Sequence, residues 1–180
     1  MIFGEPTKFA ILMDCVTPWN VEGSCQNGIF HYIINSNFFP GAAQVATLGG
    51  DVHCLQTENA LTNPVEDLSI FNMDSKKAFI LMLEKMLPEK LGGEVQDGFV
   101  EDYRFNAGTY NLEGFECFVF AVACGSKVRL LAADLSCISY EGDEVLGIDA
   151  ITISEVVLER SWVAGVVKNV IDKYESDKMV

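Results

Sequence analysis

A long apolar hairpin between Gly114 and Ser136 constrains the fold more than any other stretch of this chain. Two apolar arms, Phe115–Cys124 and Lys127–Asp134, flank the dipeptide Gly125-Ser126. A Gly-Ser pair between two β-rich runs predicts a two-residue turn, because glycine tolerates the positive φ that such a turn needs. The first arm is apolar on both of its faces, which is typical of a central strand covered on both sides. We therefore expect this hairpin to form the middle of a β-sheet.

Further strand-like segments precede and follow the hairpin. The first three are apolar runs that end at a Pro, Gly or Asn turn signal, and the last is indicated by its alternation of apolar and polar residues. We expect the first two to pair antiparallel. In chain order, the segments are Lys8–Val16, Ile29–Asn35, Phe38-Phe39, a strand beginning within Tyr103–Tyr110, and Ile148–Leu158.

Two segments carry apolar residues at helical spacing, which predicts helices over residues 75–87 and 162–175. Asp74 or Ser75 caps the first helix and Ser161 the second, where Gly165 would allow close approach to the sheet. We expect residues 42–72 to be irregular, with one or two helical turns after Thr47. Runs of strands with segregated helices predict one α+β domain over residues 1–180, a mainly antiparallel sheet with two principal helices packed on it.

The N-terminus and the cysteines indicate a cytoplasmic protein. The first 16 residues have no basic region ahead of their apolar run, so we expect no signal peptide. No run approaches the roughly 18 apolar residues that a membrane span needs. The six cysteines form no CxxC pair and are scattered along the chain, so we expect reduced thiols and no zinc site.

Negative charge is the strongest global signal. The chain has 26 acidic residues against 12 basic ones, a net charge of −14. Up to Ser75 the only basic residue is Lys8, and the segment Asp134–Glu159 has seven acids and no Lys or Arg. Such a surface repels nucleic acid and anionic membranes and attracts a basic partner. A plain alternative is that the acids keep the protein soluble.

The sequence contains few of the patterns that carry catalysis. It lacks the GxSxG, HExxH, Walker A and GxGxxG motifs. We expect His31 to be a core or edge residue, and the adjacent His53 and Cys54 not to form a catalytic pair. The acids around Asp97 and Asp143 could serve as paired carboxylates of a small hydrolase, which predicts one carboxyl with a raised pKa in a cleft. Carboxylates clustered on a Gly-containing loop are usually a solvated face, and no cofactor or metal is expected.

Short matches distributed along the whole chain carry a family resemblance. They lie in the opening residues, the first strand pair, the central hairpin and the start of the last helix. The chain resembles the immunity protein 42 family, bacterial immunity proteins paired with polymorphic and contact-dependent growth-inhibition toxins. The matching residues are Met1–Ile11, Trp19-Asn20, Asn27–Phe30, Ile33–Asn35, Pro40, Tyr103-Arg104, Arg129–Ala132 and Ser161-Trp162.

The resemblance implies a cytoplasmic protein that performs no catalysis and binds and neutralises a cognate toxin domain. Many such toxins are basic nucleases, which an acidic inhibitor can approach by charge steering. Alternatives are an adaptor or structural module of another cytosolic assembly, and the small hydrolase. The oligomeric state stays open, with a homodimer as one possibility. The expected partner-binding residues are Glu94, Asp97, Glu101, Asp102, Glu141, Asp143, Glu144 and Asp149.

Overall fold

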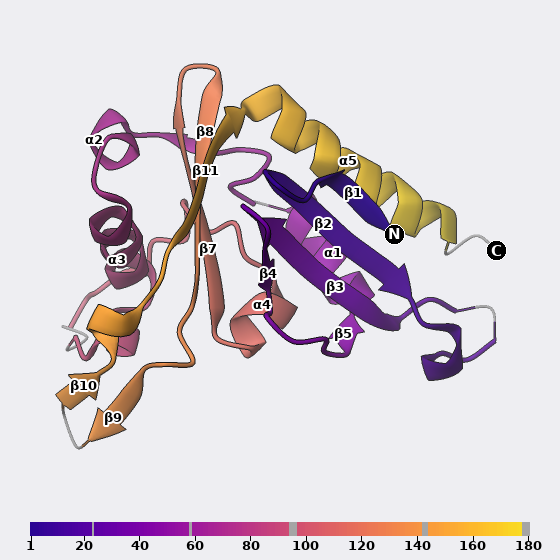
Figure 1. Ribbon diagram of the computed structural model, residues 1–180, viewed down its shortest axis with the longest axis horizontal. Coiled ribbons are helices and arrows are strands. Elements are labelled where there is room, and N and C mark those ends of the chain that lie inside the picture. The colour runs from indigo at the N-terminus through magenta and orange to yellow at the C-terminus, as the bar shows by residue number, and fades with distance from the viewer. Residues whose placement is uncertain (23, 58, 94–96, 142–143, 178–180) are drawn as a thin grey trace.

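The β7–β8 hairpin lies in the middle of a four-stranded sheet in the computed structural model, which describes residues 1–22, 24–57, 59–93, 97–141 and 144–177. Strands β7 (Cys117–Cys124) and β8 (Lys127–Asp134) pair antiparallel and are joined through Gly125, whose positive φ favours glycine. Strand β11 (Ser154–Glu159) pairs with β8, and β6 (Val65–Glu66) runs parallel to β7. The predicted central hairpin is confirmed (Figure 1).

The N-terminal part of the chain forms a second sheet. In the described residues this sheet has five strands in the order β1-β2-β3-β4, and β5 pairs with the start of β3. A small separate hairpin is formed by β9 (Ser139–Glu141) and β10 (Glu144–Leu146). The strands of the second sheet are β1 (Ile2–Glu5), β2 (Phe9–Cys15), β3 (Asn27–Ile34), β4 (Asn37–Phe39) and β5 (Ala46–Thr47).

Helices cover both sheets, which confirms the α+β class. Asp74 caps α3 by accepting a hydrogen bond from the Lys77 amide, and Pro88 follows the end of that helix. Two of the helices, α3 and α5, correspond to the two principal helices predicted from the sequence. The helices are α1 (Leu48–Gln56), α2 (Leu68–Phe71), α3 (Ser75–Met86), α4 (Tyr110–Gly114) and α5 (Arg160–Asp177).

The β7–β8 hairpin separates two hydrophobic cores. One face of β7, including Val119, packs in a core with the second sheet, α1 and α5. The opposite face, including Phe118 and Phe120, packs against α3. Figure 1 shows α3 on one side of β7 and β8, and the second sheet with α1 and α5 on the other. Burial on both faces explains why both sides of this strand are apolar in the sequence.

Residues 42–72 are more ordered than the sequence predicts. They contain β5, α1, β6 and α2, and the short helix after Thr47 is confirmed. A Cβ atom on Gly49 would lie 2.8 Å from the Tyr174 hydroxyl of α5. The glycine that weakens the helical pattern is therefore the residue that lets α5 approach α1, and tertiary packing overrides helix propensity here.

Three predicted boundaries are wrong. The expected strand within Tyr103–Tyr110 is reduced to a bridge between Asn106 and Phe120, followed by α4. The last strand begins at Ser154, because Gly147 adopts a positive φ and Ile148–Ala150 forms a short 3-10 helix. Helix α5 continues directly from β11, so Ser161 lies inside the helix. Gly165 faces open space, which removes its expected role in close packing.

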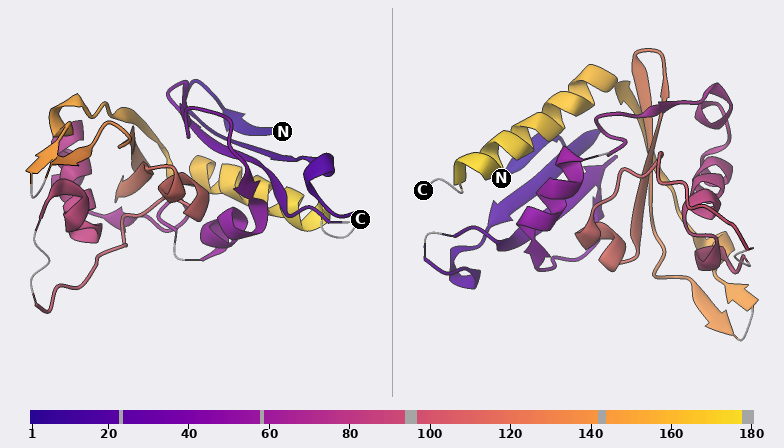
Figure 2. Two further views of the ribbon diagram at one scale, coloured as in Figure 1. Left: turned by 90° about the horizontal axis from the view of Figure 1, so that it is seen from below. Right: turned by 180° about the vertical axis from the view of Figure 1, so that it is seen from behind.

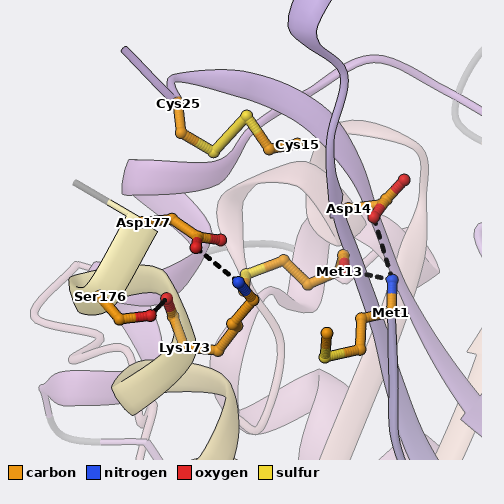
Figure 3. A network of polar contacts seen from close by, with 8 residues as sticks. All are labelled: Met1, Met13, Asp14, Cys15, Cys25, Lys173, Ser176 and Asp177. Carbon is orange, nitrogen blue, oxygen red and sulfur yellow. Dashed lines mark hydrogen bonds and ion pairs between the residues drawn. A yellow bond between two sulfur atoms is a disulfide. The ribbon is translucent and has the colours of Figure 1, made fainter. Parts of the chain in front are cut away.

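A disulfide between Cys15 and Cys25 corrects the expectation that all cysteines are reduced. Figure 3 shows this disulfide beside the N-terminus, whose amino group donates to the Met13 carbonyl (2.8 Å) and to Asp14 (3.1 Å). The Lys173–Asp177 ion pair of α5 lies at the same end of the second sheet. The disulfide joins the last residue of β2 to the loop that precedes β3 (Figure 3).

No helix in the described ranges is long and apolar enough to cross a lipid bilayer.

Arg129 ties the outer helices to the central sheet. Strand alternation places this residue of β8 on the α3 side, where its side chain is only 5% exposed. Its Nη1 donates to the carbonyl oxygens of Ile70 (3.1 Å), Phe71 (3.0 Å) and Met73 (2.7 Å). Its Nε donates to Glu155 of β11 at 2.7 Å. One buried guanidinium thus holds the end of α2 and the link to α3.

Replacing Arg129 by methionine should lower the free energy of unfolding by about 3–5 kcal/mol, because buried carbonyls and Glu155 lose their donor. Urea denaturation measures this change. The matched control is Arg160→Met, whose pair with Glu66 is more exposed and should contribute no more than about 1 kcal/mol. Equal destabilisation by the two substitutions would contradict the anchoring role of Arg129.

Candidate functional site

The first predicted acidic segment runs past the C-terminal end of α3. Asp97 and Glu101 are exposed, and Glu94 lies outside the described residues. The Asp102 amide donates to the Lys85 carbonyl of α3 at 2.8 Å. Both Asp102 carboxylate oxygens accept hydrogen bonds of 2.8 Å from Arg104, which lowers the pKa of Asp102. Asp102 is therefore already neutralised within the protein, whereas Asp97 and Glu101 are open to a partner.

The second predicted acidic segment follows β8 and is attached to both ends of the α3 region. The Tyr140 hydroxyl donates to the Lys90 carbonyl (3.1 Å), and Lys76 donates to the Asp149 carbonyl (2.8 Å). Glu141 and Asp149 are exposed, and Glu144 begins β10. Asp143 lies outside the described residues. In the left panel of Figure 2, α3 lies between this segment and the first one.

The fold adds acids that the sequence analysis missed and places lysines among them. Glu84 on α3 and Glu89 in the following 3-10 helix (Pro88–Leu91) are exposed beside the two segments. Lys76, Lys77 and Lys85 also lie on α3 and form no ion pair within the described residues. The surface around α3 therefore carries both signs of charge. Helical periodicity predicts only that Glu84 and Glu89 face solvent, so the sequence does not show that they lie beside the two acidic segments.

Carboxylates converge instead around Tyr103. The pKa of the Tyr103 hydroxyl is raised to about 12, first by burial and then by a hydrogen bond with Glu101 and the charges of Glu101, Glu113 and Glu89. These three acids come from three separate segments of the chain. Tyr103 itself is 43% exposed, so this negative potential reaches the surface.

Three hollows share two lining tyrosines, and we call this set of hollows the tyrosine groove. The first hollow, of about 660 Å³, lies beside Val65, Glu101 and Tyr103. The second, of about 600 Å³, is lined by Tyr103, Tyr110, Cys54, Asn106 and Glu113. The third, of about 400 Å³, lies between Tyr110, Asn111 and Phe115. Tyr103 lines the first two hollows and Tyr110 the last two.

The central strand β7 positions the tyrosine groove. The Ala107 amide donates to the Val119 carbonyl (2.8 Å), and the Ala121 amide donates to the Phe105 carbonyl (2.9 Å). Phe105 and Ala107 are buried, and the exposed Tyr103 and Tyr110 lie at the two ends of this anchored stretch. The segment predicted to begin a strand, Tyr103–Tyr110, therefore pairs with β7 only at residues 105–107. The tyrosines at its two ends remain exposed.

Glu113 lies half-buried in the second hollow. Its Oε1 accepts a hydrogen bond from Asn106 Nδ2 at 2.8 Å, and burial raises its pKa. A Cβ atom on Gly108 would lie 3.1 Å from the same Oε1, so glycine leaves room for the carboxylate. Its hydrogen-bond partner Asn106 is neutral, and no cation pairs with Glu113 within the described part of the chain.

Asp51 lies beneath the groove and links α1 to α4. It is fully buried, and its Oδ1 accepts a hydrogen bond from the Asn111 amide at the start of α4 (3.1 Å). Burial raises the pKa of Asp51 to about 6, against opposing effects of the Thr109 hydroxyl and the Asn111 amide. Its Oδ2 and Thr109 Oγ1 form no regular hydrogen bond with the described residues.

Other candidate groups lie apart from the groove or inside the core. His31 is buried and its Nδ1 lies 2.9 Å from the Pro40 carbonyl, which confirms a core position. His53 and Cys54 lie on helix α1 and not on a strand. Among the described residues, no three His, Cys, Asp or Glu side chains gather in a way that could hold a metal ion.

Comparisons with known proteins were made for the whole chain. The family model described as immunity protein 42 matches residues 1–173. The crystal structure of CdiI from Burkholderia dolosa AUO158 matches with a TM-score of 0.70 and 23% identity, covering 96% of this chain and 99% of that chain. At this identity the likeness shows a shared fold. A comparison with curated proteins gives no match.

Asp51→Asn should remove a pH-dependent loss of stability. Because the folded-state pKa of Asp51 is raised from 3.8 to about 6, stability is greatest with the carboxyl protonated and falls as pH rises through 6. The free energy of unfolding of Asp51→Asn relative to wild type should therefore rise by about 2 kcal/mol between pH 4 and pH 7.

Denaturant unfolding at the two pH values measures this shift. The neighbouring groups that titrate, Tyr32 and Cys54, keep raised pKa values and stay neutral over this range. Asp97→Asn is the matched control, because that carboxylate is exposed. A difference between Asp51→Asn and wild type that is the same at both pH values would contradict the assignment.

Proposed function

The chain belongs to the immunity protein 42 family, and we propose that it binds and neutralises a cognate toxin domain in the cytoplasm. The family match over residues 1–173 is the observation that carries this proposal. The fold shared with CdiI, over 96% of this chain, supports it. The protein acts in this proposal by binding and not by catalysis.

The proposed toxin domain is a basic nuclease. Nucleases that hold a phosphate backbone have positively charged clefts, and this chain carries a net charge of −14. Opposite charges accelerate encounter and orient the two surfaces. An inhibitor of this charge can cover the cleft or a flank beside it.

The proposed contact surface includes both acidic segments that the sequence indicates. Asp97, Glu101, Glu141 and Asp149 support it most directly, because their side chains are exposed on either side of α3. Asp102 contributes less, since Arg104 already engages both of its oxygens. Glu94, Asp143 and Glu144 complete the proposed set.

Co-expression with the polypeptide encoded directly upstream should test neutralisation. We expect that polypeptide to arrest growth alone, and this chain to restore growth and to co-purify with it as a stable complex. An unrelated acidic protein of similar size serves as the control for unspecific charge effects. Lack of rescue together with lack of a complex would contradict the proposal and favour an adaptor role.

Charge reversal should slow association with that toxin domain. Glu101→Lys combined with Glu141→Lys should lower the association rate constant about tenfold at low salt, with a smaller effect at high salt. The control with the same change in net charge is Glu22→Lys with Asp172→Lys, which lie in the loop after β2 and on α5. Stopped-flow mixing measures both rates, and equal slowing by the two pairs would exclude a localised acidic contact.

A further inference from the structure

Glu113 has surroundings that favour a cation from outside the protein. Its carboxyl group is half-buried and accepts a hydrogen bond from Asn106, a neutral donor, and partial desolvation raises its pKa. An incoming ammonium or guanidinium group would stabilise the charged form of Glu113. Asp102 in the first hollow differs, since it is paired with Arg104.

Two tyrosines complete the surroundings that suit a cation. Tyr103 and Tyr110 are 43% and 69% exposed, and both line the same hollow as Glu113. Aromatic rings attract ammonium and guanidinium groups through their negative faces. Exposed tyrosines are also enriched at the centres of protein interfaces. The hollow therefore brings a carboxylate and two aromatic side chains together beside an open space of about 600 Å³.

The charges around this hollow reinforce the preference. Glu89, Glu101 and Glu113 all act on Tyr103. Among the described residues that line the first two hollows, the cation is Arg104, whose guanidinium is held by Asp102. The potential at the Tyr103 end of the second hollow is therefore negative.

The shape of the groove favours an extended chain over a free small molecule. The hollow that Glu113 lines shares Tyr103 with the first hollow and Tyr110 with the third. A peptide segment can lie along all three, whereas a small ligand would fill one. A metal ion would need more ligands than gather there within the described residues.

We propose that the tyrosine groove binds an extended basic segment of the toxin domain and receives one arginine or lysine side chain between Tyr103 and Tyr110, paired with Glu113. This inference rests on the proposed function and names the chemistry of the contact. Asn106 and Gly108 are positioning residues: Asn106 orients the carboxylate, and Gly108 leaves space for it.

The test measures the dissociation constant of the complex with a catalytically inactive form of the toxin domain encoded upstream. Glu113→Gln keeps the shape and the acceptor for Asn106 but removes the charge, and Tyr110→Ala removes an exposed ring. Each should weaken binding at least tenfold, mainly through faster dissociation. The controls, Glu22→Gln and Trp19→Ala, change an exposed acid and an exposed aromatic residue far from the groove and should bind within twofold of wild type.

The variants separate this inference from the proposed function. Wild type that forms no complex would contradict the proposed function. Wild type that binds tightly, with Glu113→Gln and Tyr110→Ala binding equally well, would overturn the groove assignment alone. Thermal unfolding of each variant checks that the fold is kept, and Glu113→Gln should be at least as stable as wild type because it removes a buried charge.

A substitution scan of the toxin identifies the occupant. Each arginine and lysine of the toxin domain is replaced by alanine and tested against wild type and Glu113→Gln. One basic residue should lose at least tenfold in affinity against wild type but show little further loss against Glu113→Gln. Additive losses for every basic residue would show that no basic side chain pairs with Glu113.

Discussion

Burial of the β7–β8 hairpin on both faces is the constraint on which the rest of the structure depends. Val119 and its neighbours face the core shared with the N-terminal sheet, α1 and α5, while Phe118 and Phe120 face α3. Neither core can form without this strand pair. Arg129 of the same hairpin also positions α2 and the link to α3, because it donates hydrogen bonds to the carbonyl oxygens of residues 70, 71 and 73.

The candidate site depends on the same strand. Residues 105–107 form hydrogen bonds with β7 at Val119 and Ala121. Strand β6 pairs with the next residues of β7, Val122 and Ala123. Their burial leaves Tyr103 and Tyr110 exposed in the hollow that Glu113 also lines. The groove therefore lies on a rigid strand although its residues come from loops and a short helix, as is common for binding sites on stable scaffolds.

Sequence reasoning found what local pattern determines. The hairpin, the N-terminal strand pair, α3 and α5 follow from alternation, helical spacing and turn residues. It missed the division into two sheets, and the groove, because Cys54, Tyr103 and Glu113 meet only through long-range packing. Gly49 is an example. Its low helix propensity can be read from the sequence, but the close approach of Tyr174, which a side chain at this position would block, cannot. The acidic segments can be recognised from composition. Their position beside the lysines of α3 cannot, because it depends on how the chain folds.

Hydrogen exchange of the complex with the toxin domain is the most direct test of this account. Figure 1 shows the acidic segments around α3 at one end of the molecule and the loop after β2 at the other. Binding should protect residues 97–115 and 139–150 from exchange, with little change in residues 17–22. Protection confined to the N-terminal sheet and its loop would contradict it.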